Sequence, residues 1–237
     1  LAQLPPNYKS TYRAHMNKGK RVLALAGKPL SHTHTHSGVG ANHKANNTEM
    51  LAGEIPRAVV EAGLHFFGFL VYDCDVKADS KSVIRELRQS AHKVMMITGD
   101  SPYTAADIGR RLSFLRKDKP LLILHRMADG SLAWRAAALE DSDVAMQGDQ
   151  LFDPSAVSAL AAHSDLCVTG TSFSEIERLS SSARAIILEK TCPFINIFAR
   201  VSPSQKEAVL VALNEAGLFT LMCGDGTNDV GALKAAH

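Results

Sequence analysis

The chain has 237 residues, of which 46% are hydrophobic, and a formal net charge of +2. This length allows one large or two modest domains with a real core, and the small charge gives no indication of a nucleic acid or an anionic membrane as partner. No stretch approaches the roughly 20 consecutive apolar residues of a membrane span, and the four cysteines lack metal-site spacing, so reduced thiols in a cytosolic setting are expected.

The N-terminal part of the chain alternates between apolar runs and polar segments. A helix is predicted around residues 8–18, followed by a strand over 20–26 and a second strand over 65–71. Residues 31–53 are rich in Asn, His and Gly, which predicts a surface loop. A further helix is predicted over 79–91, because its apolar residues recur on one face.

Residues 94–97 form a short apolar run without alternation, which is typical of a parallel strand covered on both faces. The string Thr98-Gly-Asp100 follows at its carboxyl end. Ser101 and Pro102 then predict the N-cap and first position of a helix that runs to residue 112. Ligands of open α/β sheets bind outside the carboxyl ends of the strands. We therefore expect the Thr hydroxyl and the backbone N–H groups to hold a phosphoryl oxygen.

The middle of the chain is less regular. Residues 121–124 and the segment around Trp134 predict a small β excursion, and residues 140–154 are acidic and irregular. A further strand is predicted over 166–169, and a helix over 173–183. Strands that alternate with helices in this way predict a parallel sheet covered on both faces.

A third polar group follows the strand predicted over 195–200, which ends in Arg200. Ser202 to Gln205 has the sequence of a capping box with proline at the first helical position. Lys206 follows one turn into this helix. A lone helical lysine is usually solvated, but beside the other polar groups it is expected to bind a phosphate as a point charge.

The densest polar loop is Gly224-Asp-Gly-Thr-Asn-Asp229, which follows an apolar run, residues 218–222, predicted as a buried strand. Asp225 and Asp229 suit a hard cation with oxygen ligands, and Mg²⁺ is the usual one beside a phosphate. The glycines let the backbone turn sharply and approach an anion. The alternative is a plain Asp-Gly turn.

Together, Thr98-Gly-Asp100, Phe198-Ala-Arg-Val-Ser-Pro-Ser-Gln-Lys206 and Gly224-Asp-Gly-Thr-Asn-Asp229 resemble the phosphorylation-domain signatures of P-type ATPases. Longer strings that begin at Gly19 and at Met222 are similar to type V P-type ATPases, subgroup A. That endoplasmic-reticulum group is described as cation-transporting and as a transmembrane-helix dislocase. The resemblance implies an α/β, haloacid-dehalogenase-like (Rossmann-like) fold, with a parallel sheet and helices on both faces.

The resemblance also implies a domain division. Residues 1–62 would be the C-terminal remnant of the nucleotide-binding domain, including the His/Asn-rich loop. Residues 63–237 would be an incomplete phosphorylation domain with an insertion at about 114–160. The implied reaction is phosphoryl transfer from Mg·ATP to an aspartate, followed by hydrolysis of the aspartyl phosphate.

Residue roles follow from the matching positions. In the phosphate and Mg²⁺ cradle, Asp225 and Asp229 would bind the cation, and Asn228 would shape the site. Thr98 would hydrogen-bond the phosphoryl group, and Lys206 would neutralise it.

On the nucleotide side, Gly99 and Asp100 belong to the expected ATP and phosphate contacts, with Asp100 and Arg200 at the hinge. Arg21 resembles the arginine that reaches toward the ATP phosphates.

The family's nucleophile lies in an Asp-Lys-Thr-Gly-Thr string, which is absent from these 237 residues. We therefore expect the chain to be an excerpt of a multi-pass protein of the endoplasmic reticulum membrane, lying on its cytosolic side. The nucleophile, the actuator domain and the membrane domain would lie elsewhere in that protein, and the isolated chain should be inactive. Its expected partners are ATP, those domains, and a transported cation or transmembrane helix, without a nucleic acid.

Two alternatives remain at this stage. The chain could be a soluble phosphatase of the same superfamily, with Asp73 and Asp75 as its Asp-x-Asp pair, or a non-catalytic domain of a truncated gene product. Separately, His32, His34 and His36 could bind Zn²⁺ or Cu²⁺, although a polar insertion loop is the favoured interpretation.

Overall fold

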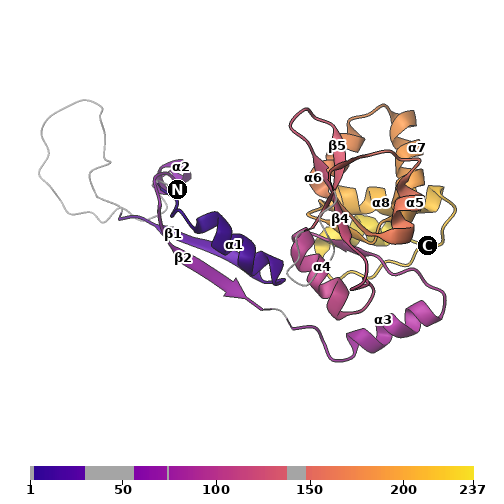
Figure 1. Ribbon diagram of the computed structural model, residues 1–237, viewed down its shortest axis with the longest axis horizontal. Coiled ribbons are helices and arrows are strands. Elements are labelled where there is room, and N and C mark those ends of the chain that lie inside the picture. Colours follow the sequence, from indigo (N-terminus) through magenta and orange to yellow (C-terminus); the bar gives the residue numbers. More distant parts are fainter. Residues whose placement is uncertain (1–2, 30–55, 74, 138–147) are drawn as a thin grey trace, which may run out of the picture. The chain divides into compact units, whose positions relative to one another are not determined.

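The computed structural model describes residues 3–29, 56–73, 75–137 and 148–237 (Figure 1). These residues form two compact units. Unit 1 comprises Leu1–Ala14 and Val22–Tyr72, and unit 2 comprises His15–Arg21 and Asp73–His237. No helix in the described part of the chain is long and apolar enough to cross a membrane.

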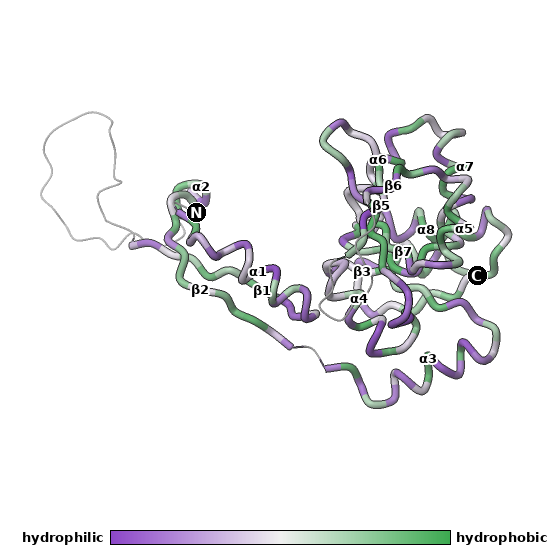
Figure 2. The backbone as a smooth tube through the Cα atoms, in the orientation of Figure 1, coloured by the Kyte–Doolittle hydropathy of each residue, from purple (hydrophilic) through white to green (hydrophobic). Residues whose placement is uncertain are grey.

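Unit 1 is built around a two-stranded sheet. Its elements are helix α1 (Tyr8–Asn17), whose last residues belong to unit 2, strand β1 (Arg21–Gly27), helix α2 (Arg57–Val60) and strand β2 (His65–Tyr72), with β1 paired to β2. The ring of Tyr8 lies 5.1 Å from that of Phe66 and 5.0 Å from that of Phe69. These aromatic contacts attach α1 to the sheet, and Figure 2 shows the apolar character of β2.

Unit 2 holds the larger sheet and most of the helices. Its elements in chain order are α3 (Ser80–Gln89), β3 (Met96–Thr98), α4 (Pro102–Arg111), β4 (Leu121–Arg126), β5 (Leu132–Ala136), β6 (Gln150–Leu151), α5 (Val157–His163), β7 (Asp165–Thr169), α6 (Gly170–Glu177), α7 (Ser181–Thr191), the short 3₁₀ helix η2 (Cys192–Phe194), β8 (Ile197–Ala199), α8 (Pro203–Glu215), a second 3₁₀ turn η3 (Thr227–Asp229) and α9 (Val230–Ala235).

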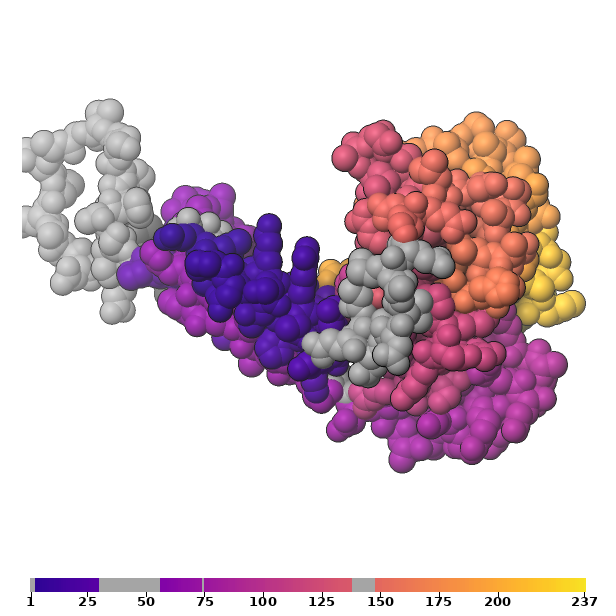
Figure 3. Space-filling model, viewed as in Figure 1, coloured from indigo at the N-terminus to yellow at the C-terminus, as the bar shows by residue number. Residues whose placement is uncertain are grey.

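The sheet has the strand order β3-β8-β7-β4-β5-β6. The first four strands are parallel, and β5 and β6 join antiparallel at one end. Residues 121–124, expected with the segment around Trp134 in a small β excursion, form part of β4, which pairs with β5 and also with β7 of the main sheet. The turn between β4 and β5 projects from this unit (Figures 1 and 3).

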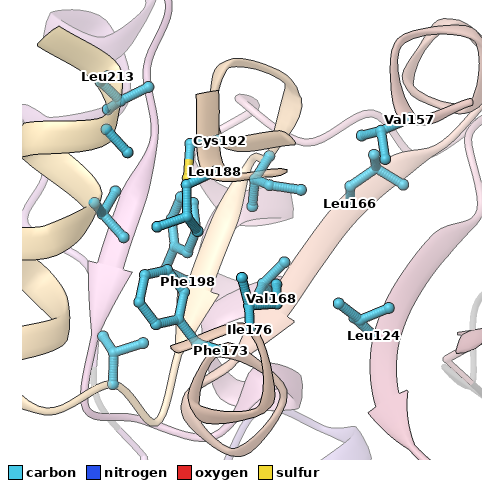
Figure 4. Close-up of a cluster of buried hydrophobic side chains, with 14 of the residues drawn as sticks. Leu124, Val157, Leu166, Val168, Phe173, Ile176, Leu188, Cys192, Phe198 and Leu213 are labelled. Atoms are coloured by element: carbon cyan, nitrogen blue, oxygen red, sulfur yellow. The ribbon is translucent and has the colours of Figure 1, made fainter. Parts of the chain in front are cut away.

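Helices cover both faces of the sheet, as predicted. Alternate strand residues point to opposite faces, so Leu122 and Leu124 enter one apolar cluster while Leu121 and Ile123 enter the other. The first cluster includes side chains of α5, α6, α7 and α8, and Figure 4 shows Phe173, Ile176 and Leu213 among them. The second cluster is covered by α4. The α/β fold is therefore confirmed, with a largely parallel sheet flanked by helices, consistent with a haloacid-dehalogenase-like (Rossmann-like) fold.

Two expected elements differ from the structure. Residues 218–222 form no strand, and Phe219 and Leu221 are 91% and 85% exposed. A strand needs a partner for its backbone groups, and none of the described strands pairs with residues 218–222. The helix expected over 173–183 is two helices, because the Ser180 hydroxyl accepts a hydrogen bond from the backbone N–H of Ala183 and caps α7.

Candidate functional site

The site is organised by the N-terminus of α8. The Ser202 hydroxyl accepts a hydrogen bond from the Gln205 backbone N–H, and the Gln205 side chain accepts one from the Ser202 backbone, which completes the capping box. This start fixes the helix phase and turns Lys206 inward, where it is only 5% exposed. A buried ammonium requires a partner, and the Lys206 Nζ lies 2.5 Å from Asp229 Oδ1.

Asp229 in turn closes the polar loop. It is 6% exposed, and the Lys206 ammonium lowers the pKa of its carboxyl from the ordinary value. Its second oxygen, Oδ2, accepts a hydrogen bond from the Gly226 backbone N–H at 3.4 Å. Both carboxylate oxygens of Asp229 are therefore engaged within the protein.

The glycines of this loop are required by close packing. A Cβ on Gly224 would lie 2.7 Å from the Asp229 Cβ, and one on Gly226 would lie 2.1 Å from the Asn228 Oδ1. Asp225 and Asn228 themselves are exposed. The loop thus folds around Asp229 and leaves the Asp225 carboxylate accessible to solvent.

A second group lies where β3 and β8 end side by side. The Thr98 hydroxyl accepts a hydrogen bond from the Asp100 backbone N–H at 3.0 Å. The carbonyl groups of Thr98 and Asp100 accept hydrogen bonds from the backbone N–H groups of Val201 and Arg200. Gly99, between them, is exposed. The Thr-Gly-Asp turn is therefore fixed to the start of the β8–α8 connection.

Arg200 adopts a left-handed backbone conformation, with φ of 56°. This conformation is unfavourable for a residue with a Cβ, and such residues cluster at functional sites. The strand β8 ends here, and the chain turns over the carboxyl edge of the sheet into α8. The exposed Arg200 side chain is thereby displayed at the edge where ligands of α/β sheets bind.

Arg21 is the first residue of β1 but belongs to unit 2, where it contacts the Thr-Gly-Asp turn. Its Nη2 donates hydrogen bonds to both carboxylate oxygens of Asp100, at 2.6 and 2.8 Å. The side chains are 53% and 26% exposed, so water screens this ion pair and its contribution to stability is small.

The predicted site residues thus fall into two contact groups. One joins Lys206 to Asp229, and the other joins Thr98 and Asp100 to Arg200 and Arg21. The β8–α8 connection links the groups, because Val201 binds the Thr98 carbonyl and Ser202 begins the helix that carries Lys206.

The donor set suits Mg²⁺ in chemistry. Asp225 offers an exposed carboxylate, and oxygen donors are what this cation prefers. Among residues 3–29, 56–73, 75–137 and 148–237, no three His, Cys, Asp or Glu side chains are grouped so as to hold a metal ion. A cation at Asp225 would therefore complete its shell with water, backbone or phosphate oxygens, as Mg²⁺ commonly does.

Gln205 was given no role beyond the cap, yet it is 6% exposed and hydrogen-bonded to α6. The capping box was visible in the sequence, but the contact with α6 was not, because it depends on tertiary packing.

Other predicted features have these outcomes. His32, His34 and His36 lie outside the described residues. Asp73 follows β2 of the two-stranded sheet and pairs with Lys20, and Asp75 lies 3.6 Å from Arg111.

The described thiols agree with the expectation of free cysteines: Cys167, Cys192 and Cys223 form no disulfide. Burial raises the pKa of Cys167, and it raises that of Cys192 to about 12.

No family model matches the chain. The whole chain nevertheless aligns with known proteins, at 38% identity with an endoplasmic reticulum transmembrane helix translocase of Aspergillus fumigatus and at 36% with one of Saccharomyces cerevisiae. It is 35% identical to a probable manganese-transporting ATPase of Arabidopsis thaliana. The resemblance to type V P-type ATPases is confirmed. The alignments cover 100% of this chain and 17 to 18% of the relatives' lengths, so the similarity to these ATPases concerns one segment of a much longer protein.

Proposed function

We propose that this chain is part of the cytosolic ATP-hydrolysing machinery of a type V P-type ATPase. Its role would be to hold Mg²⁺ and the transferred phosphoryl group while another part of the protein moves a cation across, or extracts a helix from, the endoplasmic reticulum membrane. One observation carries the proposal: the buried Lys206–Asp229 ion pair, at 2.5 Å, closes a loop that exposes Asp225.

The charges support phosphoryl transfer. Lys206 would supply positive charge to the phosphoryl oxygens, and Asp229 holds the amine in place until they arrive. Asp225 would hold Mg²⁺, which when bound offsets negative charge on the phosphate oxygens. The Thr98 hydroxyl and the backbone N–H groups that follow it would orient the phosphoryl group.

The nucleophilic aspartate would come from outside these 237 residues, which contain no Asp-Lys-Thr-Gly-Thr string. Two features support a place for its strand in unit 2. Among the described strands, β3 pairs only with β8, which leaves one edge open. The apolar residues Phe219 and Leu221 are exposed without a strand partner. A parallel strand between these segments would satisfy both.

The nucleotide would approach from the side of Arg21. Its guanidinium now binds Asp100, and on ATP binding it would exchange this carboxylate for phosphate oxygens, which it recognises with the same geometry. Arg200 and Gly99 would line the same approach.

Phosphoenzyme formation tests the proposal. The longer ATPase that contains this segment should take up acid-stable phosphate from labelled Mg·ATP, whereas the isolated chain should take up none. In the longer protein, Asp225→Asn and Lys206→Met should each reduce the labelling or its turnover by at least about 100-fold. Asp129→Asn, in an exposed turn of the same unit, is the matched control and should label normally. Stoichiometric labelling of the isolated chain, or unchanged labelling of both site variants, would contradict the proposal.

The phosphatase alternative has less support, because Asp73 does not follow a strand of the large sheet. Hydrolysis of p-nitrophenyl phosphate by the isolated chain, abolished by Asp73→Asn, would revive it. A non-catalytic product of a truncated gene would show neither activity in any context.

A further inference from the structure

We propose that Gln205 is a positioning residue for Lys206, acting through hydrogen bonds that tie the start of α8 to one face of α6. This inference deepens the proposed function, because it concerns how the phosphate-binding amine is held in place.

The Gln205 carboxamide does more than cap its own helix. Its Oε1 accepts the Ser202 backbone N–H at 3.0 Å, which is the contact a capping box requires. Its Nε2 is not needed for the cap. That nitrogen lies 3.1 Å from the Gly170 carbonyl, 3.0 Å from the Ser174 hydroxyl and 3.1 Å from Glu177 Oε2.

The three acceptors share one face of α6. Residues 170, 174 and 177 are spaced four and three apart, which places them one above another along a helix. The amide of Gln205 is thus directed at a row of acceptors, and this row fixes α8 in position and in rotation about its axis. Because Lys206 is the next residue, its direction from α8 is fixed as well.

Gly170 makes the close approach of the two elements possible. A Cβ at this position would lie 2.1 Å from the Arg200 carbonyl oxygen and 3.0 Å from Gln205 Oε1. The first turn of α6 therefore packs directly on the β8–α8 connection. The Gln205 side chain is buried where these two elements meet. A buried amide that loses its hydrogen-bond partners incurs the full cost of its desolvation. The packing of α8 that keeps the Gln205 amide hydrogen-bonded to α6 is therefore favoured over shifted positions.

The position of Gln205 affects the contact between Lys206 and Asp229. The Lys206 side chain must extend from α8 to the polar loop, and both Lys206 and its partner Asp229 are buried. If the start of α8 rotated or shifted, the 2.5 Å contact with Asp229 would lengthen. Gln205 touches neither the ion pair nor the proposed ligands, so its effect would be transmitted only through the position of Lys206.

A direct test observes the Lys206 ammonium by nuclear magnetic resonance in the isolated chain labelled with ¹⁵N-lysine. Lys206 is the one buried lysine among the described residues, so its ammonium should give a protected signal, identified by its loss in Lys206→Met. Gln205→Leu should broaden or abolish that signal while the far-ultraviolet circular dichroism stays unchanged. Gln89→Leu, at an exposed position of α3, is the matched control and should leave the signal intact.

Exchanging Gln and Glu between positions 205 and 177 distinguishes an effect on the position of Lys206 from a general loss of packing. Gln205→Glu places a carboxylate against Glu177 and should abolish the signal at neutral pH. Adding Glu177→Gln removes the second carboxylate and supplies an amide donor to the new carboxylate at position 205, although the Gly170 carbonyl still lacks its donor. The double variant should therefore recover part of the signal. If Gln205→Leu fails to fold, this pair of variants decides the question. An unchanged ammonium signal in Gln205→Glu, or no recovery in the double variant, would overturn the proposal.

A second readout uses the longer ATPase. Gln205→Glu should lower kcat about 10- to 100-fold with little change in KM for ATP, because misplacement of a group that acts on the phosphoryl centre slows the chemical step. The Glu177→Gln addition should restore part of the lost kcat. If the wild-type ATPase formed no phosphoenzyme, the proposed function would fail, whereas the ammonium signal would still decide the role of Gln205.

Discussion

The Lys206 ammonium and the Asp229 carboxylate form a buried ion pair that joins the first turn of α8 to the polar loop before α9. The two residues are 23 positions apart, and the chain between them includes most of α8 and the exposed apolar residues Phe219 and Leu221. Loss of one partner leaves the other charge buried, which is far more costly than loss of an exposed pair.

Lys206→Met is therefore expected to destabilise the isolated chain by about 3 kcal/mol, because the Asp229 carboxylate loses its counter-charge in a buried position. Chemical denaturation measures the effect. Lys190→Met, at an exposed position of α7, is the control and should change stability by less than about 0.5 kcal/mol. Adding Asp229→Asn to Lys206→Met should recover part of the loss, and a strictly additive double variant would argue against the pair.

Gly170→Ala should destabilise unit 2 by about 2 kcal/mol or more, since its methyl group would collide with a backbone carbonyl rather than a movable side chain. Thermal unfolding gives the measurement. Gly148→Ala is the control, because a Cβ there meets nothing within 4 Å. Equal melting temperatures for the two variants would show that α6 and the β8–α8 connection are not packed as described.

Asp165 predicts a pH dependence of stability. Burial raises the pKa of its carboxyl above the ordinary value, so the folded protein disfavours the ionised form. The protonated Asp165 carboxyl therefore contributes stability that is fully present below its ordinary pKa. This contribution is lost as the pH rises through the folded-state pKa. Asp165→Asn can still accept the Arg116 N–H, which lies 3.0 Å from Oδ2. The variant should be more stable than the wild type at pH 7, and this advantage should shrink as the pH falls through the raised folded-state pKa toward the ordinary value of 3.8.

The control for this series is Asp129→Asn. Its carboxyl has a lowered pKa because the Ser131 hydroxyl and N–H donate to it, so its substitution should give no gain at pH 7. Denaturation curves at several pH values would contradict the prediction if both variants behaved alike.

Leu221→Ser should leave the stability of the isolated chain within about 0.5 kcal/mol of the wild type, because the side chain is 85% exposed. It should also reduce self-association, measured by sedimentation, because exposed apolar chain is prone to pair with other copies. Leu166→Ser, at a fully buried position of β7, should destabilise strongly. A large loss at Leu221 would indicate that the segment is packed.

The cysteines should differ in reactivity. Cys223 is exposed, whereas Cys167 and Cys192 are buried with raised pKa values. Iodoacetamide at pH 8 should therefore modify Cys223 well before the other two, as followed by site-resolved mass spectrometry. In denaturant all three should react at similar rates. Early modification of Cys167 in the native chain would contradict the packing of β7.

Capping residues in the sequence were sufficient to predict where α4 and α8 begin. Ser101 with Pro102, and Ser202 with Gln205, predicted two helix starts that the structure confirms. Non-local pairing was harder. Residues 218–222 have the composition of a strand, but a strand forms only with a partner. The contact of Gln205 with α6 was invisible for a related reason, because nothing in a sequence shows which acceptors a buried amide will meet. The role of Asp225 and Asp229 as a metal pair stays a prediction.

The turn between β4 and β5 has a practical use. It closes with a hydrogen bond from the Met127 N–H to the Ser131 carbonyl and contains Gly130 with a positive φ. Two strands, β8 and β7, lie between β4 and β3 in the sheet. A fluorophore or affinity tag inserted there would be carried rigidly by the sheet without blocking Thr98. Such a reporter would let movements of unit 2 be followed within a longer protein.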